Sequence, residues 1–548
     1  MPPAPISSPP PSKEAAEDVW LKDPGKHTFA KAPRVLIIGG GSRGSAYAWA
    51  TLTATNSRVV AIAEPIAYKR ARFGRKYIWR ERQPRPEQQF EGWKQWVKYE
   101  ESRRERERAG EKVEPGVDAV FVCVLDEMHE EVVCGIARLG VHICCEKPMA
   151  TRLQSCVNMY KALKGAGEDA GEGERKEAIF GICHVLRYSP HNLMLRHLVL
   201  EKEVIGDVLS IEHVEPVGWW HFSHSYVRGN WRKESKTAPS LLTKSCHDID
   251  FLLWMLCSPP PHADPKPHLP SHLTSTGSRN FFRKERKPIA AGDATNCMSC
   301  PHEKDCTYSA PKIYGDRHLK RGNTGWPVKI VNPEIEDVYK TAGVAAATKQ
   351  LYKDLREDYN EDTPVSEVEA RPWFGRCVWD ADNDVCDDQS VTITWDDDPI
   401  RSDKEGRPIL KGRGAKTAQF HMVAFTEKTC QRRGRIYGTK GEITYDSMEI
   451  KVYEFASGKK TVHRPHMAPG GHGGGDQGLA RQFLRAAEAV DSKRMSAAEA
   501  QRQFLGCDLE EAFRSHAMVF AAEDARLERK VVDWEKWWAE QVESQLHK

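Results

Sequence analysis

Residues 34–50 read RVLIIGGGSRGSAYAWA, and this stretch decides the fold of the first part of the chain. An apolar run typical of a buried strand leads into a glycine-rich turn and then into a helix. Gly39 permits the tight turn, Gly41 lets a pyrophosphate approach the backbone, and Gly44 lets helix and strand pack closely. The phosphates would lie at a helix N-terminus, where free N–H groups favour negative charge. The stretch therefore predicts a dinucleotide-binding βαβ unit.

A second apolar run, residues 58–63, ends at Glu64, about twenty residues after Gly44. A carboxylate at this position accepts hydrogen bonds from a ribose diol and repels a 2′-phosphate, which favours NAD over NADP. Lys69, Arg70 and Arg72 follow closely and offer positive charge for that phosphate. NADP therefore stays open as the alternative cofactor.

The same rhythm of strands and helices continues along the chain. Further strands are expected at residues 117–125, 141–145 and 178–183, and residues 78–115 read as a charged helix or a disordered insertion. Alternating strands and helices imply a doubly wound parallel sheet with right-handed crossovers. We predict a Rossmann domain over residues 31–185, preceded by a disordered Pro-rich tail over residues 1–30.

The remainder, residues 186–548, reads as a second domain of the α/β class. Residues 206–214, 390–395 and 434–445 alternate apolar and polar side chains, which indicates strands of a sheet with one covered face. Long polar loops are expected at residues 258–296, 311–340 and 396–416. The chain length of 548 residues fits two domains with insertions better than one core.

Composition excludes several classes of function. The chain has 81 Lys and Arg against 78 Asp and Glu, a net charge of +3, which argues against nucleic-acid binding through a basic surface. No apolar run approaches the roughly eighteen residues that span a membrane, and the first residues lack the regions of a signal peptide. We expect a cytoplasmic protein that binds neither nucleic acid nor membrane.

Four motifs together resemble the Gfo/Idh/MocA oxidoreductases, a family that includes glucose-fructose oxidoreductase, inositol dehydrogenases and sugar dehydrogenases. They are the glycine turn at 39–44, Ala-Glu-Pro at 63–65, Glu-Lys-Pro at 146–148 and Cys-His-Asp-Ile-Asp at 246–250. The resemblance implies a Rossmann domain joined to an α/β domain with an open, mostly antiparallel sheet. Because that sheet often mediates oligomerisation in the family, a homo-oligomer is expected.

The resemblance assigns the chemistry to Lys147 and His247. In the family, the lysine of Glu-Lys-Pro reaches both the nicotinamide region and the substrate hydroxyl, and the matching histidine exchanges a proton near neutral pH. One departure is Thr243, which stands where the family often has an aspartate. Asp250, three residues after His247, either orients the imidazole or has only a structural role.

Other contacts are expected around this pair. Ser42, Arg43, Leu125, His129 and Glu146 complete the predicted cofactor site. Lys244 and Asp250 are predicted to face the substrate.

Residues 219–231, WWHFSHSYVRGNW, combine aromatic rings with groups that bind hydroxyls. A packed core strand is the alternative, but burying so many unpaired polar groups would be costly. We favour the wall of a substrate pocket, formed by His221, His224, Arg228 and Trp231. Residues 470–476, GGHGGGD, either close over the substrate or form a flexible connection.

Cysteines form one further cluster. Cys297, Cys300 and Cys306 lie in a polar loop, and Cys377 is the first choice for a fourth ligand. Four thiolates satisfy the tetrahedral preference of zinc, so one interpretation is a structural zinc site. Because a second CxxC motif is absent, a reduced loop without metal is the equal alternative.

Together these features predict an NAD(P)-dependent enzyme that transfers a hydride at a secondary alcohol of a sugar, cyclitol or related polyol. Two alternatives remain. One is a redox-neutral enzyme that uses transient oxidation for elimination or glycoside cleavage. The other is a non-catalytic NAD-binding sensor or scaffold, which the replacement at Thr243 would explain.

Overall fold

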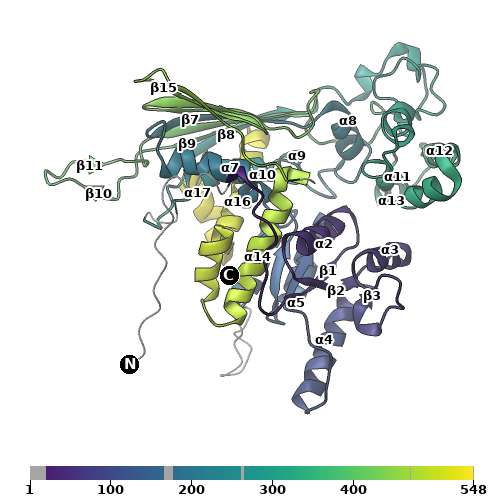
Figure 1. Ribbon diagram of the computed structural model, residues 1–548. Coiled ribbons are helices and arrows are strands. Elements are labelled where there is room, and N and C mark those ends of the chain that lie inside the picture. Colours follow the sequence, from purple (N-terminus) through teal and green to yellow (C-terminus); the bar gives the residue numbers. More distant parts are fainter. Residues whose placement is uncertain (1–19, 166–176, 261–263, 469–470, 547–548) are drawn as a thin grey trace.

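The computed structural model describes residues 20–165, 177–260, 264–468 and 471–546, and it contains two large sheets (Figure 1). Most of the predicted N-terminal tail, residues 1–19, lies outside the described residues. The first sheet has six parallel strands in the order β3-β2-β1-β4-β5-β6, which is the Rossmann order. Its strands are β1 (Arg34–Ile38), β2 (Arg58–Ala63), β3 (Gln89–Phe90), β4 (Ala119–Val122), β5 (His142–Cys145) and β6 (Phe180–Ile182). The predicted doubly wound parallel sheet is confirmed.

Helices cover both faces of this sheet. They are α2 (Ser42–Ala54), α3 (Ala67–Tyr77), α4 (Trp93–Arg108), α5 (His129–Ala137) and α6 (Leu153–Gly165). The charged stretch 78–115 contains the helix α4, in which Glu100 accepts hydrogen bonds from Arg103 at 2.8 Å and Arg104 at 2.7 Å. Because residues three and four apart face each other on a helix, these charges support α4. The stretch is therefore folded and not a disordered insertion.

A helix from the far end of the chain completes the Rossmann domain. Helix α14 (Gly475–Asp491) places Phe483 edge-to-face against Phe121 of β4, with the ring centroids 5.2 Å apart. Leu479, Phe483 and Ala487 share one apolar core with strands β1 and β4. The predicted domain boundary at residue 185 therefore leaves α14 outside the Rossmann domain, although α14 is needed to bury one face of the Rossmann sheet.

The second sheet has nine strands in the order β16-β15-β14-β13-β7-β12-β9-β8-β17. Every neighbouring pair is antiparallel except β7 and β12, so the expected open, mostly antiparallel sheet is confirmed. The strands are β7 (Val208–Pro216), β8 (His272–Ser278), β9 (Asp388–Trp395), β12 (Lys416–Val423), β13 (Arg433–Gly438), β14 (Gly441–Tyr445), β15 (Ile450–Glu454), β16 (Lys460–His463) and β17 (Val532–Asp533). A small hairpin, β10 (Arg401–Ser402) and β11 (Pro408–Ile409), extends beyond the sheet (Figure 1).

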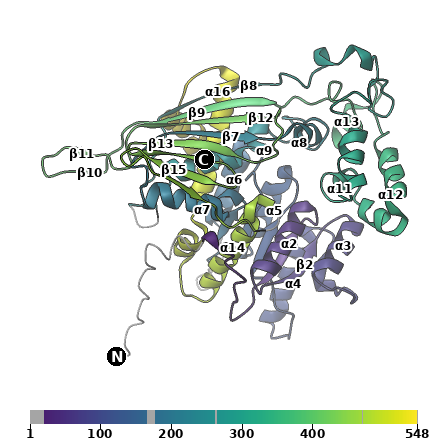
Figure 2. The same ribbon diagram turned by 45° about the horizontal axis from the view of Figure 1, so that its top comes forward.

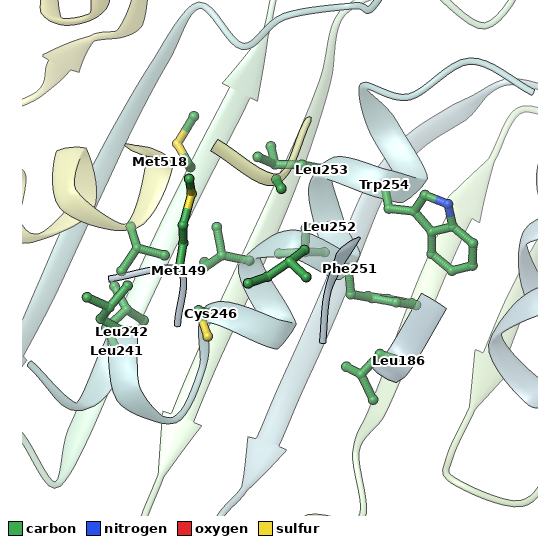
Figure 3. Packing of buried hydrophobic residues seen from close by; sticks show 14 of the residues in the cluster. Met149, Leu186, Leu241, Leu242, Cys246, Phe251, Leu252, Leu253, Trp254 and Met518 are labelled. Carbon is green, nitrogen blue, oxygen red and sulfur yellow. The ribbon is translucent and has the colours of Figure 1, made fainter. Parts of the chain in front are cut away.

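Helices on the covered face of this sheet share a core with the Rossmann domain. They include α7 (Pro190–Arg196), α9 (Ser240–Thr243), α10 (Cys246–Leu256), α16 (Leu509–Glu528) and α17 (Trp534–Trp538). Two further short helices lie against the Rossmann domain, α15 (Ala497–Ala500) on α14 and α18 (Ser544–Leu546) on α6. Every residue of α10 is buried, and Figure 3 shows Phe251 and Leu252 of this helix in the same cluster as Met149 and Met518. This continuous core fixes α10 relative to the chain that follows β5.

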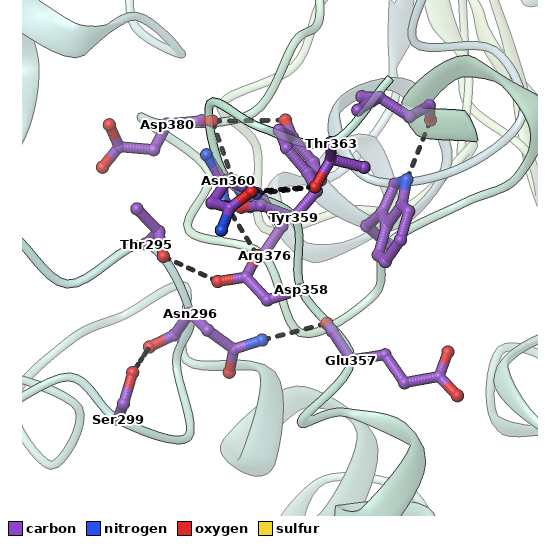
Figure 4. Close-up of polar contacts among 12 residues, drawn as sticks. Thr295, Asn296, Ser299, Glu357, Asp358, Tyr359, Asn360, Thr363, Arg376 and Asp380 are labelled. Carbon is purple, nitrogen blue, oxygen red and sulfur yellow. Dashed lines mark hydrogen bonds and ion pairs between the residues drawn. The ribbon is translucent and has the colours of Figure 1, made fainter. Parts of the chain in front are cut away.

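A third body, which we call the lobe, comprises residues 279–387 between β8 and β9. It contains α11 (Val328–Val331), α12 (Ile335–Asp354) and α13 (Val365–Ala370) and lies beside α8 (Trp219–Phe222) (Figure 2). Polar contacts join separate segments of the lobe, such as Arg376 to the Asp358 carboxylate at 2.8 Å and Asn296 to the Glu357 carbonyl at 3.2 Å (Figure 4). Much of the stretch 311–340, expected as a loop, is helical because the lobe has its own apolar core. Within the described part of the chain, no helix is long and apolar enough to cross a membrane.

Candidate active site

One large cavity of about 1880 Å³ runs between the Rossmann domain, the second sheet and the lobe. At one end it is lined by the glycine turn and by Glu64. Further along it is lined by Lys147, Trp231 and His247. The structure therefore brings the predicted cofactor residues and the predicted catalytic pair to one continuous space.

Each glycine of the turn meets a different structural requirement. Gly39 has a φ of +99°, and a Cβ there would lie 2.3 Å from the Cys123 carbonyl oxygen. A Cβ on Gly44 would lie 2.0 Å from the Gly39 carbonyl oxygen, so Gly44 permits the close packing of α2 on β1. A Cβ on Gly41 meets no atom within 4 Å, and Gly41 lines the cavity. The space beside Gly41 fits a pyrophosphate group.

Glu64 is buried at the end of β2, next to the glycine turn. Its carboxylate accepts hydrogen bonds from the backbone N–H of Gly40 at 2.7 Å and of Ile66 at 2.9 Å. Arg70 donates to the Glu64 carbonyl at 2.5 Å, and Arg72 is paired with a glutamate of the lobe. These contacts hold the carboxylate at the cavity wall and engage both arginines that could otherwise receive a 2′-phosphate.

Arg43 connects three parts of the chain at the mouth of the cavity. Its guanidinium donates to Glu146 at 2.6 Å and to Asp476 at 2.7 Å. Although burial opposes it, Arg43 and His472 hold the pKa of Asp476 below its usual range. His472 lines the cavity and lies 3.2 Å from Asp476, whereas Gly470 of the same glycine segment lies outside the described residues.

The turn that carries Lys147 is held by two buried histidines. His129 Nδ1 donates to the Pro148 carbonyl at 2.7 Å, and His516 Nε2 accepts from the Met149 N–H at 2.8 Å. Leu125 lines the cavity, but His129 does not. The cofactor contact predicted for His129 is therefore corrected, because this ring lies beneath the turn and positions it.

Lys147 itself is held by groups from three different elements. Its Nζ donates to the Thr243 carbonyl at 2.7 Å and lies 5.9 Å from the centre of the Trp231 ring. The Trp231 indole N–H donates to the Asp126 carboxylate at 2.7 Å. Where the family pattern has an aspartate at position 243, this chain offers a backbone carbonyl, and a carboxylate approaches from Asp126 on the opposite side.

Asp126 is a functional candidate that the sequence reasoning did not include. It is buried, and burial raises the pKa of its carboxyl, opposed by the charges of His129 and Lys147 and by the Trp231 hydrogen bond. The signal in the sequence is its place just after β4, because ligands of open parallel sheets bind at the carboxyl ends of the strands.

His247 lies in the first turn of α10 and lines the cavity. Burial, reinforced by the charge of Lys147 and by His184, holds its pKa well below the usual value, so the imidazole is neutral. Its Nδ1 is buried without a hydrogen-bond partner in the described structure. The ring centres of His184 and His472 lie 5.8 and 6.2 Å away.

Two residues predicted to face the substrate have structural partners instead. Asp250 is fully buried, does not line the cavity, and accepts two hydrogen bonds of 2.8 Å from Arg187. That prediction is corrected, because Asp250 neutralises a buried guanidinium. Lys244 reaches the cavity, but its Nζ pairs with Glu215 at 2.7 Å.

The aromatic segment 219–231 is helical, with α8 continuing into a turn over residues 223–227. His221, His224 and Trp231 line the cavity. Arg228 does not line it and is nearly fully buried, donating to the carbonyls of Arg376 at 2.6 Å and Tyr308 at 2.8 Å. The substrate contact predicted for Arg228 is corrected, because this side chain binds the lobe to the segment 219–231.

The four cysteines of the predicted zinc site line one small cavity inside the lobe: Cys297, Cys300, Cys306 and Cys377. Among the described residues, however, no group of three or more His, Cys, Asp or Glu side chains is placed to hold a metal ion. Arg228 instead donates to the Cys297 sulfur at 3.3 Å. The zinc interpretation is not supported, and the thiols are part of the contact between Arg228 and the lobe.

Residues 33–173 match the model of the GFO_IDH_MocA family, described as an oxidoreductase family with an NAD-binding Rossmann fold. This match covers the glycine turn, Glu64 and the Glu-Lys-Pro turn. The dinucleotide-binding part of this chain is therefore similar to the NAD-binding domain of the Gfo/Idh/MocA family. Its NAD-binding character agrees with the open space beside Gly41 and the buried carboxylate of Glu64.

Curated relatives match about a quarter of the chain. A 2,7-anhydro-N-acetylneuraminate hydratase of Escherichia coli is 30% identical over 140 residues, which are 26% of this chain and 34% of that protein. A 1,5-anhydro-D-fructose reductase of Ensifer adhaerens is 29% identical over 27% of this chain and 41% of its own. The chain thus spans less than half the length of these relatives.

Solved structures resemble nearly the whole chain. A levoglucosan dehydrogenase bound to NADH and levoglucosan has a TM-score of 0.53 at 14% identity, covering 92% of this chain and 99% of its own. An inositol dehydrogenase homologue of Azotobacter vinelandii bound to NAD⁺ has a TM-score of 0.56 at 12% identity, covering 94% and 100%. At such identities the likeness shows that the two-domain fold is shared.

Proposed function

We propose that the protein is an NAD-dependent oxidoreductase that acts on a secondary alcohol of a sugar, cyclitol or related polyol. The observation that carries the proposal is that Lys147 and His247 line the same cavity as the glycine turn. Relatives named as a reductase of an anhydro sugar and as an inositol dehydrogenase support the substrate class.

The cofactor end would be held by the glycine turn and Glu64. The N–H groups at the start of α2 and the space beside Gly41 suit the pyrophosphate, and Glu64 suits a ribose diol. When bound, the nicotinamide supplies the acceptor for a hydride. NAD is favoured over NADP because the carboxylate of Glu64 is fixed at the cavity wall and Arg70 and Arg72 are already engaged.

Lys147 is the group proposed to move the proton. In the oxidation of an alcohol, the hydroxyl proton must leave as the C–H bond is broken, and the Lys147 amine would take it; in reduction the ammonium returns it. The Thr243 carbonyl and the Trp231 ring hold the Nζ in place, which keeps the proton transfer in one geometry. The neutral His247 ring would bind the same or the adjacent hydroxyl.

The direct test is a panel of free sugars, inositols and their ketone forms, assayed with NAD⁺ or NADH at 340 nm. Turnover with at least one compound, abolished in Lys147→Ala, is the expected result. Absence of turnover in both directions, with NADH bound in a calorimetric titration, would reject the oxidoreductase activity while leaving cofactor binding in place.

A second candidate is a redox-neutral reaction in which oxidation is transient. The observation favouring it is that one relative is named a hydratase, a reaction with no net redox change. Such an enzyme would convert its substrate without a lasting change at 340 nm. Following the same panel by NMR with catalytic NAD⁺ separates this candidate from a dehydrogenase.

The open face of the second sheet is the proposed surface for self-association. Its strands alternate buried and part-exposed residues, as in β9, so one face remains available to a second copy. Light scattering coupled to size-exclusion chromatography tests this assignment.

A further inference from the structure

The lobe is an addition that the sheet itself does not need. Strands β8 and β9 are direct antiparallel neighbours, with Leu273 opposite Ile393, and such strands can be joined by a turn of a few residues. Residues 279–387 instead leave the sheet and return after forming a separate apolar core around Tyr314, Leu351 and Leu355. In both ribbon views the lobe stands beside α8 (Figures 1 and 2).

The lobe supplies an aromatic wall to the cavity that holds Lys147. Trp326, Trp373 and Phe374 of the lobe all line this cavity. The Trp326 ring is 36% exposed, and its centre lies 4.8 Å from that of His221, at right angles to it. On the neighbouring side His224 stacks on Phe374 at 5.1 Å. The rings of the lobe thus continue the wall begun by the segment 219–231.

This wall starts close to the reaction centre. The Lys147 Nζ lies 5.9 Å from the centre of the Trp231 ring, and Trp231 stacks on Tyr226 with the ring centres 5.7 Å apart. The Tyr226 ring centre lies 6.3 Å from that of His221, which in turn lies 4.8 Å from that of Trp326. A continuous series of aromatic rings therefore runs from Lys147 to the lobe.

Polar groups accompany the rings at this end. Asp354, Glu357 and Arg371 line the cavity, and Arg371 lies 3.9 Å above the Trp373 ring while pairing with Glu357. A cavity wall that combines aromatic rings with carboxylate and guanidinium groups suits a sugar ring, which has apolar C–H faces and hydroxyls at its edge.

We propose that the lobe forms a second sugar subsite on Trp326, so that the substrate is a disaccharide or larger glycoside. One ring would react at Lys147 and His247, and the ring linked to it would lie against Trp326. This inference rests on the proposed oxidoreductase function for its first ring, but the binding of the second ring can be measured without turnover.

The test compares free sugars with disaccharides that carry the same reacting ring. Glucose, galactose, mannose and N-acetylglucosamine are each paired with disaccharides of both anomers, and kcat/KM is measured with NAD⁺ in wild type, Trp326→Ala and Trp326→Phe. We expect wild type to prefer one disaccharide, and Trp326→Ala to lose roughly tenfold on it while changing little on the free sugar. Trp326→Phe should retain most of the preference because it keeps a ring.

Trp49→Ala is the matched control, since Trp49 has the same 36% exposure but does not line the cavity. Arg371→Gln is a second variant at the far edge of the subsite, and it should reduce the preference for the disaccharide if Trp326→Ala fails to fold. Equal kcat/KM for the free sugar and every disaccharide in wild type, or an equal loss on both in Trp326→Ala, would overturn the subsite.

A binding measurement separates this proposal from the enzymatic one. Calorimetric titration of the same disaccharides into protein saturated with NADH requires no turnover. If no compound is turned over but a disaccharide binds and Trp326→Ala weakens that binding, the subsite stands and the oxidoreductase proposal fails. If free sugars are turned over but no disaccharide binds, the subsite is wrong and the oxidoreductase proposal stands.

Discussion

The two ends of the cavity are built in different ways. The cofactor end comes from one short stretch, Gly39 to Ser45, with Glu64 from the next strand. The substrate end gathers residues that are far apart in the sequence, such as Asp126, Trp231 and Trp326. The first end depends on local backbone geometry and the second on how three bodies pack together. Changes at one end should therefore leave the other end working.

The largest expected effect is at the substrate end. Lys147→Ala should lower kcat/KM by about a hundredfold or more, the usual scale for a positioned acid-base group, because the amine proposed to exchange the proton is lost. The Kd for NADH, measured by fluorescence, should stay within about twofold of wild type, since the pyrophosphate site is the glycine turn. Lys161→Ala, an exposed lysine of α6, serves as control. Near-normal turnover in Lys147→Ala would remove this residue from the chemistry.

At the cofactor end, substitutions at two glycines of the same motif should affect different properties, NADH binding for Gly41 and stability for Gly44. Gly41→Val should fold normally, because a Cβ meets nothing within 4 Å, but should weaken NADH binding by roughly tenfold or more by filling the pyrophosphate space. Gly44→Ala should lose stability, because its Cβ would lie 2.0 Å from the Gly39 carbonyl oxygen. Calorimetry and thermal melting on both variants measure the two effects. Unchanged NADH affinity in Gly41→Val would contradict the assignment of the turn.

The same contrast explains how far the sequence could be interpreted. The glycine turn, five of the six parallel strands and the position of Glu64 follow from local patterns, since each depends on residues that are close in the chain. The short strand β3 was not predicted, because it lies in the charged stretch 78–115. Helix α14 could not be assigned to the Rossmann domain, because only the folded sheet shows that its face is covered by Phe483. The lobe was expected as loops because its apolar residues are too widely spaced to reveal a shared core.

The roles of polar side chains at the substrate end were harder to predict from the sequence than the helices and strands. Asp250 and Arg228 have the right chemistry for a substrate site, but each has found a buried partner, Arg187 for Asp250 and backbone carbonyls for Arg228. Conversely, the place of Asp126 just after β4 is only a weak signal in the sequence, and its place in the site becomes clear from its position in the cavity wall and its hydrogen bond to Trp231. Contacts between domains decide which polar side chains remain available for binding or catalysis. These contacts could not be predicted from the sequence alone.

A smaller effect should follow from weakening the contact between Trp231 and Asp126 at the substrate end. Trp231→Phe keeps a ring near Lys147 but removes the indole N–H that donates to Asp126 at 2.7 Å. We expect kcat to fall about two- to tenfold, the scale of one cation–π or hydrogen-bond contact, with NADH affinity unchanged.

The Asp126→Asn variant distinguishes an electrostatic effect of Asp126 on Lys147 from a purely structural role. The amide oxygen still accepts from Trp231, but the negative charge near the Lys147 ammonium is lost. The basic limb of the pH profile of kcat/KM for reduction should then move to lower pH. An unchanged pH profile, together with a lower melting temperature, would show that Asp126 only joins the two domains.

The smallest expected effect concerns the buried histidines around the Lys147 turn. Burial lowers the pKa of His184 to about 3 and that of His516 to about 4, from an ordinary value near 6.5. Below pH 6.5 the unfolded chain binds protons that these rings in the folded protein do not bind. Their contribution to stability is therefore complete above pH 6.5 and declines as the pH falls from 6.5 toward 4.

The pH window from 7.5 to 5.5 isolates this effect, because ordinary carboxylates stay ionised throughout it in both states. One neutral buried histidine should account for about 1 kcal/mol of the stability lost between these pH values. His516→Gln keeps an oxygen that can accept from the Met149 N–H, which His516 Nε2 accepts at 2.8 Å, but cannot take up a proton. Urea unfolding of this variant should show a smaller loss of stability over the window by about that amount, whereas His272→Gln, on strand β8, should behave as wild type. An identical pH dependence in wild type and His516→Gln would mean that the ring beneath the Lys147 turn is not held neutral by the fold.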